Sequence, residues 1–234
     1  MSVAELSPRQ AFLLGVRALL PMHLGVAPFG VIYGVIAIQS GIPPLAAVLM
    51  SSVVFAGSAQ FVLAQMVGAG APLMLAVGTV GMINLRHALY SASVAPLLPR
   101  LSRRWKVLLS YLLTDEAYAA AIPHLMAAPR SASGQWILFG SGIALWAGWQ
   151  AATVAGVLLG SGLPDDLGLD FALPLTFIAI VVPMLTERGR IVAALCAAVV
   201  AVALSGLPWK LGLLASAVLA IVVGGAISKG ESDA

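Results

Sequence analysis

The chain has 234 residues, of which 61% are hydrophobic and 9% are charged, and its formal net charge is +3. Ordinary soluble domains carry about 25% charged residues, so this composition excludes a soluble globular protein and indicates that the chain lies in lipid. The net charge does not indicate nucleic-acid binding, because the basic residues cluster in short loops, as the orientation of a membrane protein requires. We therefore expect an all-α protein that spans the lipid bilayer several times and binds no nucleic acid.

Residues 1–20 form a short amphipathic lead-in before the first long apolar run. They resemble the start of a signal peptide, but the apolar segment after them lacks a small-x-small cleavage site and is interrupted by prolines. Residues 22–38 are therefore predicted to be a retained first membrane helix. Gly30 and Gly34 form a G-x-x-x-G pair within it, which favours close packing against another helix.

The second apolar run, residues 45–66, carries polar side chains at membrane depth. Ser51, Ser58 and Gln65 are spaced seven residues apart and would share one face of an intact helix. Gly57 allows two interpretations. It can be a hinge where the helix breaks and presents backbone groups, as in secondary transporters, or a small residue that permits tight helix packing.

The third run, residues 73–98, contains Arg86 near its middle. An arginine at that depth costs at least about 2.5 to 3.5 kcal/mol on insertion scales, so it normally faces a polar cavity or an opposite charge. Asp115 and Glu116 lie inside the next run, residues 107–126. We therefore expect Arg86 to face Asp115, Glu116 or both along a polar pathway. The alternative is a buried ion pair that only fastens two helices together.

Two further features of the sequence concern Arg86 and the orientation of the chain. Asn84 and His87 are three residues apart, so they can lie on one polar face of the same helix as Arg86. The loop after this run is strongly basic, which places it in the cytoplasm under the positive-inside rule. Its basic residues are Arg100, Arg103, Arg104 and Lys106.

The fifth run, residues 136–159, carries a ladder of small residues spaced four apart. Such a ridge permits close backbone contact with another helix. We therefore expect the ladder to pack against another helix, and either the ladder or the Gly30 and Gly34 pair is a candidate surface for contact with a second chain. The ladder consists of Gly140, Ala144, Gly148, Ala152, Gly156 and Gly160.

Three more apolar runs complete the chain, at residues 171–185, 191–207 and 211–227. Counting every run as a full crossing puts basic clusters on opposite sides of the membrane. The conflict disappears if residues 45–66 and 107–126 are discontinuous, or enter and leave on the same side. The expected fold is thus a polytopic α-helical membrane protein with about 6–8 membrane segments, some of them discontinuous or re-entrant. Residues 1–234 would form one membrane transport domain, with the lead-in at residues 1–20, the membrane segments at residues 21–228 and a short polar tail at residues 229–234.

Four motifs give the chain a resemblance to a known family. They are Pro28-Phe29-Gly30, the stretch M-S-S-V-V-F-A-G-S-A-Q-F at residues 50–61, N-L-R-H-A-L-Y at residues 84–90 and L-T-D-E at residues 113–116. With them the chain resembles the AzlC family, the large subunit of bipartite branched-chain amino acid exporters. The resemblance implies a transporter of the bacterial cytoplasmic membrane that exports valine, leucine, isoleucine and also methionine, with a small hydrophobic AzlD-type partner.

The chemistry of the polar residues is compatible with such a substrate, which has a carboxylate, an ammonium group and an apolar side chain. Arg86, or a helix N-terminus at a break near Gly57, can hold the carboxylate. Asp115 or Glu116 can hold the ammonium group, and the same carboxylates or His87 can instead carry a coupling proton. The remaining candidate site residues are Asn84, Ser58 and Gln60, and Phe29, Phe55 and Phe61 are available as apolar wall residues.

Other functional classes fit the sequence less well. The chain has no G-x-x-x-x-G-K-[ST] motif, so it cannot bind ATP in the P-loop manner, and we expect no cofactor and no metal ion. A serine hydrolase would need Ser58 with His87 or His124 as its base, but the G-x-S-G pattern is missing, and we expect no enzyme. A passive channel or a structural membrane subunit remains the alternative to a transporter driven by the proton gradient.

Overall fold

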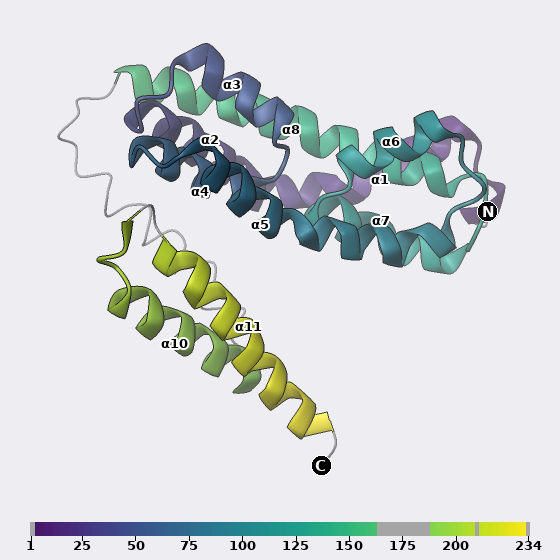
Figure 1. Ribbon diagram of the computed structural model, residues 1–234. Helices are drawn as coiled ribbons and strands as arrows, with labels where there is room; N and C mark the ends of the chain where they lie inside the picture. Colours follow the sequence, from purple (N-terminus) through teal and green to yellow (C-terminus); the bar gives the residue numbers. More distant parts are fainter. Residues whose placement is uncertain (1–2, 163–187, 209–210, 233–234) are drawn as a thin grey trace. The chain divides into compact units, whose positions relative to one another are not determined.

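The computed structural model describes residues 3–162, 188–208 and 211–232, and the chain divides into two compact units (Figure 1). The first unit contains helices α1 to α8, and the second contains α10 and α11. Within the described ranges every regular element is helical, which confirms the all-α prediction for these residues. Two helical stretches there are long and apolar enough to cross a membrane, Pro8–Gln39 and Gly134–Gly162. The predicted run at residues 171–185 lies outside the described residues.

The helices of the first unit begin and end where the local sequence favours it. Ser7 caps the first helix by accepting a hydrogen bond from the Gln10 backbone N–H, and Gln10 Oε1 accepts one from the Ser7 backbone N–H in return. Ser102 caps the sixth helix by accepting a hydrogen bond from the Trp105 backbone N–H. The helices are α1 (Pro8–Leu19), α2 (His23–Gln39), α3 (Pro44–Val53), α4 (Gly57–Gly68), α5 (Leu73–Val94), α6 (Arg103–Leu112), α7 (Asp115–Ala127) and α8 (Gly134–Gly162).

Helices α1, α2 and α8 form the scaffold of the first unit. A 3-10 turn, Leu20–Met22, joins α1 to α2, and both helices pack along α8. Their backbones touch: a Cβ added at Gly156 would lie 2.0 Å from the carbonyl oxygen of Val31, and one at Gly34 would lie 2.5 Å from that of Thr153. The predicted packing role of the small-residue ladder is therefore confirmed. The ladder and the glycines of α2 face each other inside the unit, so the prediction that one of them docks a partner subunit is wrong.

The second apolar run folds as a broken hairpin, α3 and α4. Helix α3 ends at Val53 and α4 begins at Gly57, with a non-helical tip between them. The base of the hairpin is closed, because a Cβ added at Gly68, the last residue of α4, would lie 3.1 Å from the Cβ of Ser40. This run therefore enters and leaves at the same end of the unit. The break also separates Ser51 from Ser58, so the helix is not intact and the shared face expected for an intact helix does not form.

The fourth run folds as a second broken hairpin, α6 and α7, with its tip at Leu113 and Thr114. Its base is closed by a hydrogen bond of 2.6 Å from the backbone N–H of Arg130 to the carbonyl oxygen of Leu97. The predicted discontinuity of both polar runs is thus confirmed, and so is their return to the end from which they came.

The two hairpins enter the unit from opposite ends. Helix α5 runs from the base of the first hairpin to the base of the second, about 33 Å at 1.5 Å for each of its 22 residues. Figure 1 shows α3 and α4 beside α2, and α6 and α7 beside α1 at the other end of α8. The tips meet midway, where the Tyr111 hydroxyl donates to the carbonyl oxygen of Ser52 and the Phe55 and Tyr111 ring centroids lie 5.9 Å apart.

The second unit is a pair of packed helices, α10 (Arg188–Ala203) and α11 (Leu211–Ser232). They are in close contact at small residues, since a Cβ added at Gly224 would lie 2.8 Å from the Cβ of Ala193. The two helices correspond to the predicted runs at residues 191–207 and 211–227.

Candidate functional site

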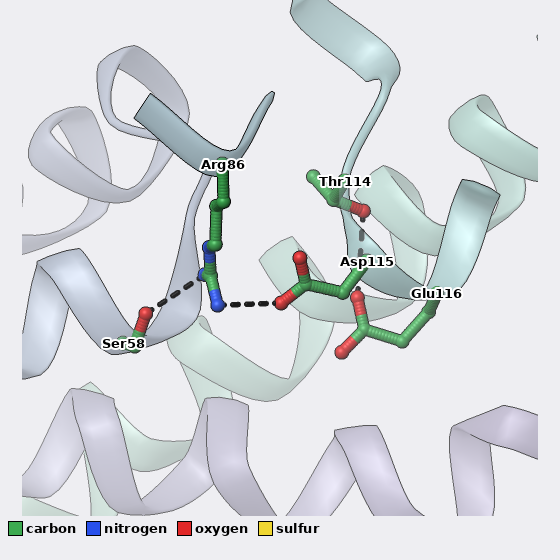
Figure 2. Close-up of polar contacts among 5 residues, drawn as sticks. All are labelled: Ser58, Arg86, Thr114, Asp115 and Glu116. Atoms are coloured by element: carbon green, nitrogen blue, oxygen red, sulfur yellow. Dashed lines mark hydrogen bonds and ion pairs between the residues drawn. The ribbon is translucent and has the colours of Figure 1, made fainter. Parts of the chain in front are cut away.

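The candidate site lies where the two hairpin tips meet α5. Arg86 Nη1 lies 2.7 Å from Asp115 Oδ2, and Arg86 Nη2 donates a hydrogen bond of 2.8 Å to Ser58 Oγ. One guanidinium group from α5 therefore holds the start of α4 and the start of α7 together (Figure 2). The predicted contact between Arg86 and Asp115 is confirmed. We call Arg86, Asp115 and Ser58 the arginine centre.

Both partners of Arg86 sit at helix N-termini inside the unit. Asp115 is the first residue of α7, and Ser58 is the second residue of α4. Free N–H groups and the helix dipole make such ends favourable for negative charge. Asp115 supplies that charge at α7, whereas the first turn of α4 contains no acidic residue. The end of α4 is thus suited to an anionic group from elsewhere.

Several polar atoms around the arginine centre have no hydrogen-bond partner within the described part of the chain. They are Asn84 Oδ1, Arg86 Nε, His87 Nε2 and Asp115 Oδ1. The side chains of Arg86 and Asp115 are 32% and 36% exposed, so the pair is neither sealed in the core nor fully at the surface. Free donors and acceptors therefore lie side by side, as a ligand with both a carboxylate and an ammonium group requires.

Glu116 has a different partner from Asp115. Its Oε2 accepts a hydrogen bond of 3.4 Å from Thr114 Oγ1, and the ion pair of Arg86 is made with Asp115 (Figure 2). Two carboxylates were predicted as possible partners of Arg86, and in the structure the ion pair is formed with Asp115. Glu116 lies one residue further along α7, in its first turn.

Gln60 lies at the break of the first hairpin and braces it. Its Nε2 donates to the carbonyl oxygens of Ser51, at 3.1 Å, and Val54, while its Oε1 accepts a hydrogen bond of 3.1 Å from Trp149 Nε1. A broken helix leaves carbonyl groups without intrahelical partners, and in lipid the protein itself must satisfy them. Gln60 therefore positions the tip that carries Ser58, and the structure places it outside the arginine centre.

Sequence reasoning missed the polar side chains of α8 that support this break. Trp149 Nε1 donates to Ser51 Oγ at 3.0 Å, Ser51 Oγ lies 3.1 Å from Thr153 Oγ1, and Gln150 Nε2 donates to the Ser51 carbonyl oxygen at 3.3 Å. The sequence signal that could have identified them is the spacing of four residues between Trp149 and Thr153, which places both side chains on one helix face. A Cβ added at Gly57 would lie 2.8 Å from the Trp149 ring, so Gly57 both starts α4 and allows this close approach, and both of its predicted roles hold.

Aromatic side chains surround the first hairpin. The Phe61 ring stands edge-on to Phe29 and Tyr33, with centroid distances of 6.2 Å and 6.1 Å, and Tyr33 stacks on Trp149 at 6.4 Å. Phe55 packs on Tyr111 at the hairpin tips instead. Two of the three predicted wall residues therefore belong to one aromatic cluster, and the third belongs to the contact between the tips.

A second row of side chains runs along α5 away from the arginine centre. The rings of His87 and Tyr90 lie 6.1 Å apart, Tyr90 stacks on Tyr118 at 4.9 Å, and the Tyr118 hydroxyl lies 3.0 Å from Ser93 Oγ. His87 is therefore on the same face of α5 as Tyr90. The hydrogen bond of Ser58 also argues against the serine hydrolase alternative. Ser58 accepts this bond from Arg86, and a permanently charged guanidinium group cannot act as the base that a serine nucleophile needs.

Comparison with known proteins adds independent information. The protein family described as AzlC protein matches residues 21–163. The inner membrane protein YgaZ of Escherichia coli is 32% identical over 205 residues, which cover 84% of this chain and 83% of YgaZ. An uncharacterized membrane protein of Archaeoglobus fulgidus is 29% identical over 79% of this chain and 80% of its own length. The branched-chain amino acid transport protein AzlC of Bacillus subtilis is 28% identical over 69% of this chain and 63% of its own length. No solved structure matches.

Proposed function

Because this chain belongs to the AzlC family of membrane proteins, we propose that it is the large subunit of a secondary transporter that exports branched-chain amino acids across the bacterial cytoplasmic membrane. The substrates are valine, leucine and isoleucine, with methionine as a further one, and the proton gradient drives export. The names of the Bacillus subtilis and Escherichia coli relatives support the substrate class and the membrane. The observation that carries the proposal is the arginine centre between two half-helix N-termini.

The geometry of the centre suggests how a zwitterionic substrate is held. The carboxylate binds between Arg86 and the N-terminus of α4, whose first turn contains no acidic residue. The ammonium group binds Asp115, whose Oδ1 has no protein partner in the described residues. The apolar side chain lies toward the aromatic cluster around Phe61. Discontinuous helices use their N-termini in this way in other transporter folds.

The opposed hairpins suggest how access alternates. Each hairpin enters the unit from a different end and closes that end. Arg86, near the middle of α5, connects the two hairpin tips. When substrate takes over the bonds of Arg86, one hairpin is free to move relative to α5 while the other still seals the opposite end. The base of the α6 and α7 hairpin carries the basic loop at residues 100–106, so this end faces the cytoplasm and takes up the substrate.

Proton coupling and the small subunit complete the proposal. Asp115, Glu116 or His87 carries the proton, because ionisable groups at membrane depth are typical of proton relays. An AzlD-type subunit docks on a surface other than the small-residue ladder, which is occupied by α2.

Transport by purified protein tests the proposal. Proteoliposomes containing this chain and the small subunit should accumulate labelled leucine against its gradient when a proton gradient is imposed, and a protonophore should abolish the accumulation. Valine, isoleucine and methionine should compete with leucine, and alanine should compete poorly. Flux that only follows the leucine gradient would show a passive channel, and no amino acid flux with both subunits present would show a structural subunit.

A further inference from the structure

A large basic cavity runs along the α6 and α7 hairpin, from its base to Leu113 at its tip. Its volume is about 970 Å³. Three basic side chains from three segments line it, namely Arg100 in the loop before α6, Lys106 in α6 and Arg130 in the loop after α7. The rest of the lining is mainly apolar and includes Leu98, Leu109 and Leu138. We call this the basic cavity. It combines positive charge at one part of its wall with an apolar surface at another.

Arg130 is held at the cavity by an unusual backbone conformation. Its φ is 60°, in the left-handed region that residues other than glycine rarely adopt. Two hydrogen bonds to the loop before α6 fix it there, from its backbone N–H to Leu97 at 2.6 Å and from its Nε to Pro96 at 3.3 Å. Strained residues of this kind persist where the surrounding structure determines them, often at binding sites.

Among the described residues, no carboxylate neutralises the positive charge of the basic cavity. Arg100, Lys106 and Arg130 are exposed, and no carboxylate among the described residues forms an ion pair with any of them. A branched-chain amino acid has no net charge at neutral pH, so it gains little from three unpaired cations. The cavity is also much larger than such a substrate. Its charge and size instead fit a larger anion with apolar parts.

A separate apolar groove lies on another face of α6. Arg103, Arg104, Val107, Leu108 and Tyr111 line a volume of about 660 Å³ there. Val107 is 66% exposed and Leu108 is 40% exposed, so the groove presents apolar surface beside Arg103 and Arg104. Trp105 stands edge-on to Trp136 at 4.9 Å nearby, as expected at a membrane interface, where tryptophan is enriched.

We propose that the basic cavity binds the phosphate headgroup of an anionic phospholipid from the cytoplasmic leaflet, with its glycerol and upper acyl chains on the apolar lining of the cavity. The cations match the phosphate, the apolar lining matches the glycerol and the upper acyl chains, and the positive-inside rule places this end of the unit at that leaflet. The bound lipid fixes the base of the hairpin whose tip carries Asp115. This site is independent of the amino acid that the protein transports.

Native mass spectrometry of the full-length chain in detergent tests the site. The probes are phosphatidylglycerol and phosphatidylcholine with identical acyl chains, added in equal amounts. The parental chain should retain phosphatidylglycerol preferentially. The double variant Arg100→Gln, Lys106→Gln should lose roughly thirtyfold of this preference, since each basic residue near an anionic surface contributes about a factor of five. The double variant Arg9→Gln, Arg17→Gln changes the charge equally on exposed positions of α1 and should bind as the parent does.

A third variant separates binding from folding. Arg130→Gly suits the positive φ and removes the guanidinium, so it should fold and still lose about fivefold of the preference. Equal retention of both lipids by the parental chain would overturn the proposal, and so would equal losses in the two double variants. Displacement of phosphatidylglycerol by an excess of leucine would also overturn it, because the cavity would then belong to the transported amino acid. None of these outcomes depends on transport activity.

Discussion

Replacing Arg86 with alanine removes the group that joins α5 to both hairpin tips. The variant loses the ion pair of 2.7 Å with Asp115 and the hydrogen bond of 2.8 Å to Ser58. If the arginine centre binds substrate, transport should be lost even where the protein still folds. The variant Arg17→Ala is the matched control, because it removes an exposed arginine of α1 outside the centre.

The magnitudes follow from the geometry of the pair. At 2.7 Å and an effective dielectric constant of about 20, the gross attraction is about 6 kcal/mol. Desolvation offsets most of it, and both side chains are about one-third exposed, so the net loss of folding free energy should lie between the surface and buried limits, at about 1 to 3 kcal/mol. A lost charge-assisted hydrogen bond to the substrate carboxylate costs about 1.5 to 3 kcal/mol, or roughly 10- to 150-fold in affinity.

Membrane abundance and leucine export, measured on the same cells, separate the two effects. Arg86→Ala should reduce abundance moderately and export almost completely. The reversed pair Arg86→Asp with Asp115→Arg restores opposite charges but moves the anion-binding group, so abundance should return without export. If both return together, the pair is a structural clamp. Normal abundance and parental export in Arg86→Ala would refute the proposed role of the arginine centre.

Three further predictions concern stability, measured as thermal unfolding of the purified chain in detergent. Gln60→Leu removes three hydrogen bonds at the helix break, although each partner keeps another one, and should cost roughly 2 to 4 kcal/mol, whereas Gln65→Leu, with no such bonds, should stay within about 0.5 kcal/mol. Gly156→Ala places a Cβ 2.0 Å from a carbonyl oxygen of α2 and should cost about 1 to 3 kcal/mol, whereas Gly25→Ala meets no atom within 4 Å and should be neutral or stabilising. Arg130→Gly should be more stable than Arg130→Ala by about 1 kcal/mol, because φ is 60° there, and the reverse order would contradict the proposed strain.

The sequence alone determined the environment of the chain and the residues that do not suit it. Long apolar runs with few charges imply lipid, and a charge inside such a run is costly enough to need a partner. The sequence alone therefore assigned a carboxylate partner to Arg86, with Asp115 and Glu116 both open as that partner. Charge counting also showed that two runs could not be simple crossings, because the positive-inside rule then failed. Both inferences rest on where charged residues lie relative to the apolar runs, and the sequence alone gives these positions.

The tertiary structure decided what depends on neighbours in space. The small-residue ladder looks the same in sequence whether it meets a partner subunit or another helix, and only the close approach of Val31 to Gly156 assigns it to α2. The choice of Asp115 over Glu116 depends on where a hairpin tip ends, which one residue of helix rotation would change. Gln60 lies in the same motif as Ser58, yet the break between α3 and α4 turns it toward α8. Periodicity assumes an intact helix, so it gives wrong neighbours wherever a helix breaks, and in this chain the candidate site lies at two such breaks.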